Sequence, residues 1–529
     1  MRASGILMHI TSLPGNYGIG TMGKRAFDFV DFLHKSGQQS WQILPLTPTG
    51  YGDSPYQSNS AYAGNPYLID LDLLIEEGLL TAEEVTCRDW YETPDRVDFG
   101  RQYHHKLSVL RLAFARFEGG ADFDTFLAEQ SRWLPDFALF MALKEETGSA
   151  WYTWEDDLKF RRTEALQDAR KRLADEIRFC CFVQYTFFRQ WTALLRYAHE
   201  KGIEIIGDVP IYVPYDSVEV WCEPELFQLD KTLTPTAVAG CPPDGFSEDG
   251  QLWGNPLYNW TAMKKQNFAW WIRRMAAAGK LYDVIRLDHF RGFEAYWSVP
   301  YGDKTARGGK WVKGPGAAFV DALKNQLPDV RFIAEDLGTL TQEVLDLRDA
   351  SGYPGMKVLG FAFDGCSEND YLPHNYPTNS ICYTGTHDNM TTLQWLHTAS
   401  YEALDFIVEY MGLEDVADKM TQKELVWSVI KTAMASVSDL CIVQMQDYLT
   451  LGAEGRMNFP GTMSCDNWSW RAQPGFTSDA LARRIAALTR RYGRAPMEPE
   501  AAPEPETRAE AAADTELSNI CQRAIMNKE

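Results

Sequence analysis

The stretch "YDVIRLDHFRGFEAYW", residues 282–297, begins like a buried strand and then becomes polar. The letters VIRL suit a strand in a core, yet Arg286 lies among them and Asp288 follows at once. An unpaired charge inside a protein costs several kcal/mol, roughly, unless other groups compensate it. The pattern therefore predicts a strand whose end opens into a polar site. Because Arg286 and Asp288 are two apart, both side chains project to the same side of that strand.

Seven other short runs share the composition of strands and are bounded by turn residues. Amphipathic, helix-like segments lie between most of them. Strands alternating with helices indicate a parallel sheet, and eight strands predict an α/β fold of the (β/α)8 TIM-barrel type. With residues 282–288, the predicted strands are residues 5–10, 40–46, 203–213, 331–336, 357–363, 380–388 and 440–448, and the helices are 23–37, 187–202, 267–280, 317–327, 340–352 and 421–437.

Two spacings between predicted strands are too long for single βα connections. Residues 66–185, after the second strand, predict a helical insertion, and residues 214–265, after the third, predict a loop-rich insertion over the barrel mouth. The end, residues 494–529, is acidic and rich in Pro, Ala and Glu, which is typical of a disordered or loosely helical tail. Residues 1–493 are therefore expected to form the catalytic barrel with its insertions.

Charge and cysteine usage restrict the possible partners and compartment. The chain of 529 residues carries 51 basic and 73 acidic residues, a net charge of −22, which argues against nucleic acid or an anionic membrane as partner. Ten cysteines show no CxxC pair and no zinc-type spacing, so we expect reduced thiols. No secretory leader or membrane-spanning segment is recognised. These features predict a cytoplasmic enzyme and are compatible with a neutral substrate.

Aromatic residues gather beside Asn, Asp, Gly and Pro in loop-like stretches, as in "SPYQSNSAYAGNPY" and "LWGNPLYNW". The chain has 17 Trp, 24 Tyr and 27 Phe. Aromatic rings on loops suit ligands with apolar faces and hydroxyl edges, such as sugar rings. Core packing is the alternative interpretation for any single ring.

Several predicted strands end in an acid. The carboxyl ends of barrel strands meet at one face, so these side chains are expected to converge there. Clustered carboxylates repel one another, and this raises the pKa of one member enough to keep it protonated. Glycosidic bond chemistry uses such a set, with one nucleophile and one general acid/base. The acids are Asp208, Asp288, Glu335 with Asp336, Asp388 and Asp447.

Each acid also has a structural interpretation. A strand-end Asp can cap the next helix, as Asp336 could cap a helix beginning near Leu340. A salt bridge between Arg286 and Asp288 would give the same pattern as a guanidinium that keeps a nucleophile ionised. Metal binding is the competing functional interpretation, but the nearby histidines lack ligand spacing, so no metal and no cofactor are expected.

Three segments, taken in order, resemble the signature regions of the amylomaltases, the 4-α-glucanotransferases of glycoside hydrolase family 77 in the α-amylase clan. They are "DVIRLDHFRGFEAYW", "FIAEDLGTLTQEV" and "YTGTHDNMTTLQW". Further segments match the family pattern, so the resemblance extends over about residues 3–472. These include "GILMHITSLPGNYGIG", "WQILPLTPTGYGDSPYQSNSAYAGNPYLI", "GDVPIYVPYDSVEVW", "AGCPPDGFSEDGQLWGNPLYNW" and "GRMNFPGT" followed by "NWSWR".

The resemblance implies specific roles for residues of this chain. Asp288 matches the nucleophile, Glu335 the general acid/base and Asp388 the transition-state stabiliser. Asp208 matches a supporting acid, and Tyr51 falls where some members carry a second glucan site. The other implied substrate-binding positions are Arg286, His289, His387, Ser54, Tyr56, Trp253, Asn255 and Asp364.

The activity implied is retaining transfer of α-1,4-glucan segments to an acceptor glucan or glucose by double displacement, with glucose released from short donors. Maltooligosaccharides and starch or glycogen dextrins are the expected partners, with no nucleic acid and no membrane; the oligomeric state is not predicted. Two alternatives stay open: a retaining α-glucan hydrolase of the same clan, and a non-catalytic glucan-binding protein. Residues 241–256 are hypothesised to form a lid that excludes water.

Overall fold

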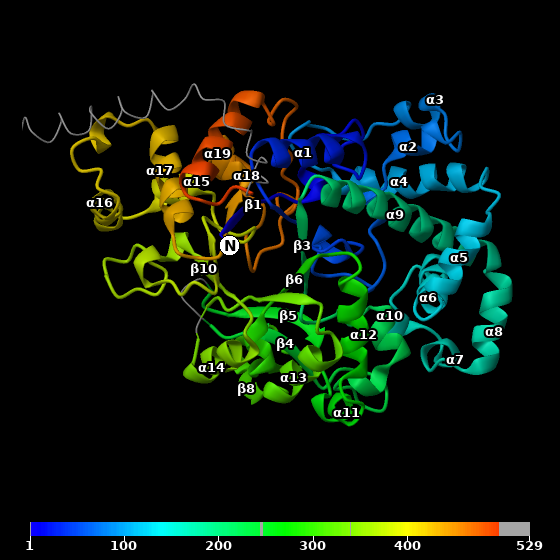
Figure 1. Cartoon of the computed structure of the whole chain (residues 1–529). Helices are drawn as coiled ribbons and strands as arrows, with labels where there is room; N and C mark the ends of the chain where they lie inside the picture. Colours follow the sequence, from blue (N-terminus) through cyan, green and yellow to red (C-terminus); the bar gives the residue numbers. More distant parts are fainter. Residues whose placement is uncertain (1, 244–246, 339, 497–529) are drawn as a thin grey trace, which may run out of the picture. The chain divides into compact units, whose positions relative to one another are not determined.

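A computed structural model describes residues 2–243, 247–338 and 340–496, apart from the side chain of Tyr51. Residues 1–495 form one compact unit, and the second unit, residues 496–529, lies outside the described residues beyond Pro496. The first unit is built around a closed barrel of eight strands in the order β1-β12-β11-β10-β9-β6-β3-β2, and every pairing that joins them is parallel (Figure 1). The strands are β1 (Ala3–Leu7), β2 (Ser40–Gln42), β3 (Glu204–Val209), β6 (Val284–Leu287), β9 (Arg331–Ala334), β10 (Gly355–Val358), β11 (Ser380–Tyr383) and β12 (Leu440–Gln444).

The predicted TIM barrel is therefore confirmed, and each of the eight predicted runs overlaps one barrel strand, although β1 and β10 each begin two residues before their predicted runs. The strands are shorter than predicted, because the chain leaves the ladder soon after the core. β2 ends at Gln42, although its predicted run continued to residue 46, and β3 ends at Val209 rather than at residue 213. The residues beyond these ends form the loops of the barrel mouth.

Helices cover the outside of the barrel. Five of the six predicted helical segments contain one, and the sixth, residues 187–202, covers the second half of α9. α1 (Lys24–Lys35) follows β1, and the end of the long α9 (Ala174–Glu200) leads into β3. The other barrel helices are α12 (Ala269–Ala278), α13 (Ala317–Gln326), α14 (Gln342–Ser351), α15 (Thr392–Thr398), α16 (Tyr401–Tyr410), α17 (Gln422–Ala435), α18 (Met445–Leu449) and α19 (Asp479–Arg491).

Between β2 and β3 all the helices and strands that the structure describes are helices, and most of them lie in the region where the helical insertion is expected. α6 packs along α9, which continues from this region onto the barrel. The helices here are α2 (Leu71–Glu76), α3 (Ala82–Thr86), α4 (Phe99–Phe114), α5 (Ala121–Glu129), α6 (Leu134–Thr147), α7 (Asp156–Lys159) and α8 (Thr163–Arg172).

Residues 214–265 contain regular structure that the sequence pattern did not reveal. Besides α10 (Val218–Cys222) and α11 (Trp260–Lys265), they hold β4 (Ala237–Cys241) and β5 (Gln251–Pro256). These pair with β7 (Ala295–Pro300) and β8 (Lys310–Lys313) in an antiparallel sheet of order β5-β4-β7-β8. The opening stretch thus contributes to two sheets, since β7 begins only eight residues after β6 ends.

Alternation along the barrel strands decides which side chains reach the interior. Ile205 and Ile285 belong to the layer between strands and helices, whereas Ile206 and Ile333 fill the barrel interior. Asp208 and Glu335 follow those interior residues by two positions and so share their side. Arg286 pairs in register with both Asp208 and Ile333, which places it on the same level of the barrel. The periodicity of the strands therefore directs this set of charges inward.

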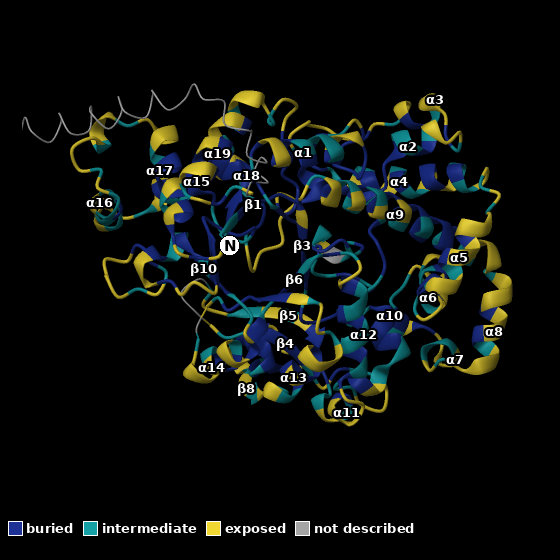
Figure 2. Cartoon of the chain, viewed as in Figure 1, coloured by how far each residue is buried: buried dark blue, intermediate teal, exposed yellow. Residues whose placement is uncertain are grey.

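The barrel strands are buried and the helices around them are exposed on one face. Figure 2 shows the barrel strands dark blue, with exposed residues on the outward faces of the helices. Among the described residues, no helix is both long and apolar enough to span a membrane.

Candidate active site

A buried arginine lies at the centre of the acid cluster. Arg286, 3% exposed, donates from Nη1 to Asp208 Oδ2 at 2.6 Å and to Asp288 Oδ1 at 3.0 Å. Its Nη2 lies 4.0 Å from Glu335 Oε2. One guanidinium therefore contacts carboxylates that follow or end three different strands, β3, β6 and β9. The structure thus confirms that Asp208, Asp288 and Glu335 converge, as predicted.

Glu335 is held by two backbone donors. Its Oε2 accepts from the His289 amide at 2.6 Å and its Oε1 from the Leu337 amide at 2.8 Å. The His289 amide reaches Glu335 because His289 adopts a left-handed backbone conformation, with φ of 51°. Such a conformation is strained for a residue with a side chain and persists where the surrounding structure enforces it. The turn after β6 thereby fixes the acid that follows β9.

The charges in this cluster do not cancel, because three carboxylates face one guanidinium. Burial raises the pKa of Glu335 to about 7, with Asp288 adding to the rise and Arg286 opposing it. Burial likewise raises the pKa of Asp208 to about 7. Burial and Asp388 raise the pKa of Asp288, against the lowering influence of Arg286 and His387. The cluster can therefore retain a proton near neutral pH, as an acid catalyst requires.

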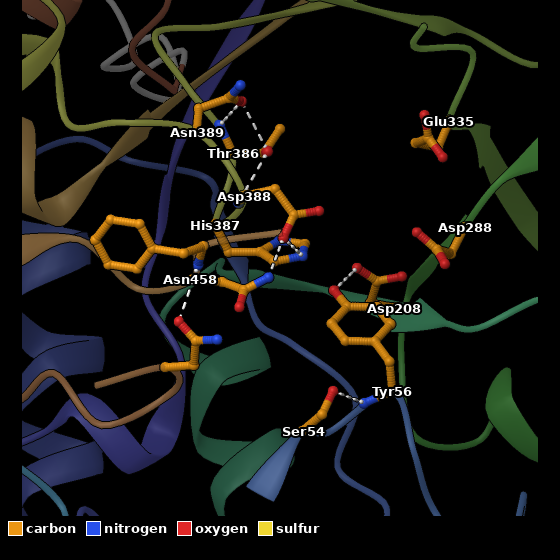
Figure 3. A network of polar contacts seen from close by, with 12 residues as sticks. Ser54, Tyr56, Asp208, Asp288, Glu335, Thr386, His387, Asp388, Asn389 and Asn458 are labelled. Atoms are coloured by element: carbon orange, nitrogen blue, oxygen red, sulfur yellow. Dashed lines mark hydrogen bonds and ion pairs between the residues drawn. The ribbon is translucent and has the colours of Figure 1, made fainter. Parts of the chain in front are cut away.

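Asp388 faces Asp288 and Glu335 across the barrel mouth (Figure 3). Its side chain is 45% exposed, far more than that of Glu335 at 11%. Asn458 donates from Nδ2 to Asp388 Oδ1 at 2.7 Å, and Arg456 donates to the Asp388 carbonyl at 3.3 Å. Sequence reasoning gave Asn458 no role, although its segment, GRMNFPG, contributed to the family resemblance.

Two aromatic pairs flank the acids. Tyr56 donates its hydroxyl to Asp208 Oδ2 at 2.8 Å and stacks on His387, with ring centroids 5.1 Å apart and an interplanar angle of 17°. Trp253, on β5, meets His289 edge to face at 4.9 Å. Burial lowers the pKa of both histidines, that of His289 to about 3. Both imidazoles are therefore neutral at pH 7 and offer one donor and one acceptor each.

The remaining predicted binding residues differ in their burial and in their hydrogen-bond partners. Ser54 accepts from the Tyr56 amide at 3.2 Å and so shapes the loop after β2. Asn255 is buried and accepts from Gln57 at 3.3 Å. Asp364 is exposed and accepts from the Cys366 amide at 2.9 Å, and it forms no hydrogen bond or ion pair with the acids among the described residues. The side chain of Tyr51 lies outside the described residues, as do residues 244–246 of the hypothesised lid.

Two strand-end acids have structural partners instead. Asp336 accepts from Arg348 and from the Met356 amide, each at 2.7 Å. The prediction that it caps a helix near Leu340 is wrong, because α14 begins at Gln342 after Thr341.

Asp447 is fully buried and accepts from the Thr384 hydroxyl at 2.6 Å and the Thr392 amide at 2.7 Å. These bonds join the ends of β11 and β12 and leave the carboxylate no contact with the other acids.

Arg291, which had no predicted role, stacks its guanidinium over Trp311 of β8, 3.9 Å from the ring centroid. The contact joins the turn that carries His289 to the antiparallel sheet. Among the described residues, no group of three or more His, Cys, Asp and Glu side chains has the geometry to hold a metal ion.

A family model described as 4-alpha-glucanotransferase matches residues 8–477. The chain belongs to the 4-α-glucanotransferase family. It is 48% identical over 493 residues to the 4-alpha-glucanotransferase of Clostridium butyricum, an alignment that covers 92% of this chain and all of that protein. The corresponding protein of Thermus thermophilus is 47% identical over 496 residues, or 92% and 98% of the two chains.

Comparison with solved structures also finds an amylomaltase. The amylomaltase of Streptococcus agalactiae, in complex with acarbose, matches with a TM-score of 0.90 at 42% identity and covers 94% of this chain and all of that one. The resemblance to amylomaltases and the expectation of a glycosyl-transferring enzyme are both confirmed. Membership in the 4-α-glucanotransferase family fixes the class of reaction.

Proposed function

We propose that Asp288, Glu335 and Asp388 transfer α-1,4-glucan segments by a retaining double displacement. Glu335 protonates the glycosidic oxygen while Asp288 attacks the anomeric carbon and forms a glycosyl-enzyme. Glu335 then takes the proton of the acceptor's 4-hydroxyl, which displaces Asp288 and restores the α-linkage. Asp388 stabilises the positive charge that develops on the sugar ring. The observation that carries this proposal is the contact of Arg286 with Asp208, Asp288 and Glu335 at one end of the barrel.

The two carboxylates differ in the way that their proposed roles require. Glu335 is nearly buried, and its raised pKa of about 7 suits a group that donates and then accepts a proton near neutral pH. Asp288 is 26% exposed and accepts a charge-assisted hydrogen bond from Arg286, which favours its ionised, nucleophilic form. Asp208 neutralises part of the Arg286 charge and positions the Arg286 guanidinium.

Substrate binding is assigned to residues around these acids. His289 and His387 are neutral and can hydrogen-bond sugar hydroxyls, and Trp253 lies beside His289 at the mouth. The other proposed binding residues are Ser54, Tyr56, Asn255, Asp364, Arg286 and Tyr51. The substrates proposed are maltooligosaccharides and starch or glycogen dextrins.

The family's activity and the net charge of −22 support a cytoplasmic protein that binds neither nucleic acid nor membranes. Residues 66–185 and 214–265 are proposed as insertions into the catalytic region of residues 1–493, with residues 494–529 as a tail. Residues 241–256, of which 244–246 lie outside the described residues, are proposed to form a lid that limits the access of water.

Incubation with maltotriose distinguishes transfer from its alternatives. Transfer gives a ladder of longer maltooligosaccharides and free glucose, with a constant number of reducing ends. A rise in reducing ends with only shorter products would mean hydrolysis, and unchanged maltotriose would mean a binding protein. Either of these two results would contradict the proposal.

A further inference from the structure

The loop that carries His387 and Asp388 runs from Thr384 to Thr392, between the end of β11 and the start of α15. The Asp388 side chain is 45% exposed, so packing alone does not fix its position. Asn458 holds one oxygen of its carboxylate. A group that acts on a transition state must stay within about 0.5 Å of its productive position. The contacts that hold this loop therefore decide how well Asp388 is placed.

The middle of the loop is a turn that is fixed internally. Asn389 accepts from both the amide and the hydroxyl of Thr386, each at 2.8 Å, and the Asp388 amide donates to the Thr386 hydroxyl at 3.3 Å (Figure 3). These bonds fix the residues of the turn relative to one another, but none of them joins the turn to the barrel. A displacement of Asp388 is therefore a displacement of the whole turn about the two ends of the loop.

One buried carboxylate holds both of these ends. Asp447 follows β12 and is fully buried. Its Oδ2 accepts from the Thr384 hydroxyl at 2.6 Å, and its Oδ1 accepts from the Thr392 amide at 2.7 Å. Asp388 lies midway between these two threonines in the sequence. Burial raises the pKa of Asp447 to about 6, so at pH 7 the group is ionised and both oxygens accept.

Asp447 has no basic partner that would explain its charge. Within residues 2–243, 247–338 and 340–496, no Lys, Arg or His forms an ion pair with its carboxylate, and its bonds come from Thr384 and Thr392. A buried charge costs several kcal/mol, roughly, unless other groups compensate it. An ionised acceptor also makes stronger hydrogen bonds than a neutral one. The charge is therefore explained by the two bonds to the loop rather than by a salt bridge.

The chain after Asp447 gives the loop weaker support. The Thr391 hydroxyl donates to the Gly452 carbonyl at 3.1 Å, and Arg456 donates to the Asp388 carbonyl at 3.3 Å. Both bonds are longer than those to Asp447. Loss of the Asp447 carboxylate should therefore loosen the loop without releasing it.

We propose that Asp447 is a positioning residue for the transfer reaction, which holds both ends of the loop and so places Asp388 and His387 against the sugar ring. This inference rests on the role proposed above for Asp388. The positive charge that Asp388 stabilises develops only in the transition state, so a misplaced Asp388 should lower kcat and leave KM almost unchanged.

Asp447→Asn tests this directly, because the amide keeps the size of the side chain but has one acceptor oxygen in place of two. In transfer from maltotriose, kcat should fall at least fivefold, with KM within threefold of wild type. Asp70→Asn is the matched control. Asp70 is also buried and accepts from a threonine hydroxyl, that of Thr21 at 2.5 Å, and from an amide, that of Leu73 at 3.1 Å. It forms no described bond to the active-site acids, so its kcat should stay within twofold.

Thr384 provides a second test that does not depend on the folding of Asp447→Asn. Thr384→Val keeps the shape of the side chain and removes the hydroxyl, whereas Thr384→Ser keeps the hydroxyl and removes a methyl group. We expect Thr384→Val to lower kcat at least fivefold and Thr384→Ser to stay within twofold of wild type. A role in packing alone would give the opposite order, because valine fills the buried space better than serine.

A smaller loss in Asp447→Asn, a loss that lies in KM, or equal losses in the two Thr384 variants would overturn the proposal. Asp388→Ala distinguishes this failure from a failure of the proposed function. Wild-type transfer by Asp388→Ala would refute the role of Asp388 and this inference together. A large loss in Asp388→Ala, with full activity in Asp447→Asn, would refute the inference alone.

Discussion

Replacing Glu335 with Gln separates the proton-transfer role of this residue from its structural role. The variant keeps the size of the side chain but cannot donate a proton. General acid catalysis contributes about 10²–10⁴-fold to rate, so we expect transfer from maltotriose to fall by that factor. An amide also offers only one acceptor oxygen for the His289 and Leu337 amides, which costs about 1.5–3 kcal/mol of stability for the lost charge-assisted bond.

The assay compares two donors in the Glu335→Gln variant. α-Maltosyl fluoride has a leaving group that needs no protonation, so formation of the glycosyl-enzyme should stay within about tenfold of wild type. Azide should then accelerate its breakdown in the variant and have no effect on wild type. Equal losses with both donors, or transfer from maltotriose within tenfold of wild type, would refute the role of Glu335.

Four further predictions follow from the same contacts. Because burial raises the pKa of Glu335 to about 7, its acid form is lost above that pH, and wild-type kcat/KM with maltotriose should fall there; a profile flat to pH 9 would contradict this. Asn458→Ala removes the bond to Asp388 and should lower kcat/KM about tenfold or more, with Thr462→Ala as the unaffected control. Arg286→Lys removes the planar guanidinium whose two terminal nitrogens contact Asp208, Asp288 and Glu335. The free energy of unfolding, measured by denaturant titration, should therefore fall by about 3 kcal/mol, and an unchanged midpoint would contradict this. Trp253→Ala should raise the hydrolysed fraction of maltotriose severalfold, read as new reducing ends, and an unchanged ratio would remove this residue from water exclusion.

The barrel was predictable because its strands are short apolar runs with turn residues at both ends, and their carboxylates follow the interior side chains by two positions. Ile206 with Asp208 and Ile333 with Glu335 show this spacing. The antiparallel sheet was not predictable in the same way. β7 begins so soon after β6 that "EAYWSVP", despite its aromatic residues, is not separated from the stretch that contains β6. β5 is interrupted by Gly and Asn, which are depleted in strands.

Within the site, the sequence correctly predicted that Asp208, Asp288 and Glu335 converge, but it could not predict what holds them. The His289 amide contacts Glu335 only because of a left-handed turn, a conformation that is unusual for histidine. Asn458 lies 70 residues from Asp388, and no local pattern links the two. Asp336 and Asp447 looked like members of the cluster because they too follow strands, but their partners, Arg348 and Thr384, come from other parts of the chain.

Identification of the residue that becomes covalently glycosylated tests the central claim most directly. The Glu335→Gln variant, incubated with α-maltosyl fluoride and without acceptor, should accumulate a glycosyl-enzyme that survives acid quenching and proteolysis. Peptide mass spectrometry should place the maltosyl group on Asp288. A label on any other residue, or turnover of the fluoride donor by Asp288→Ala at the wild-type rate, would contradict the account.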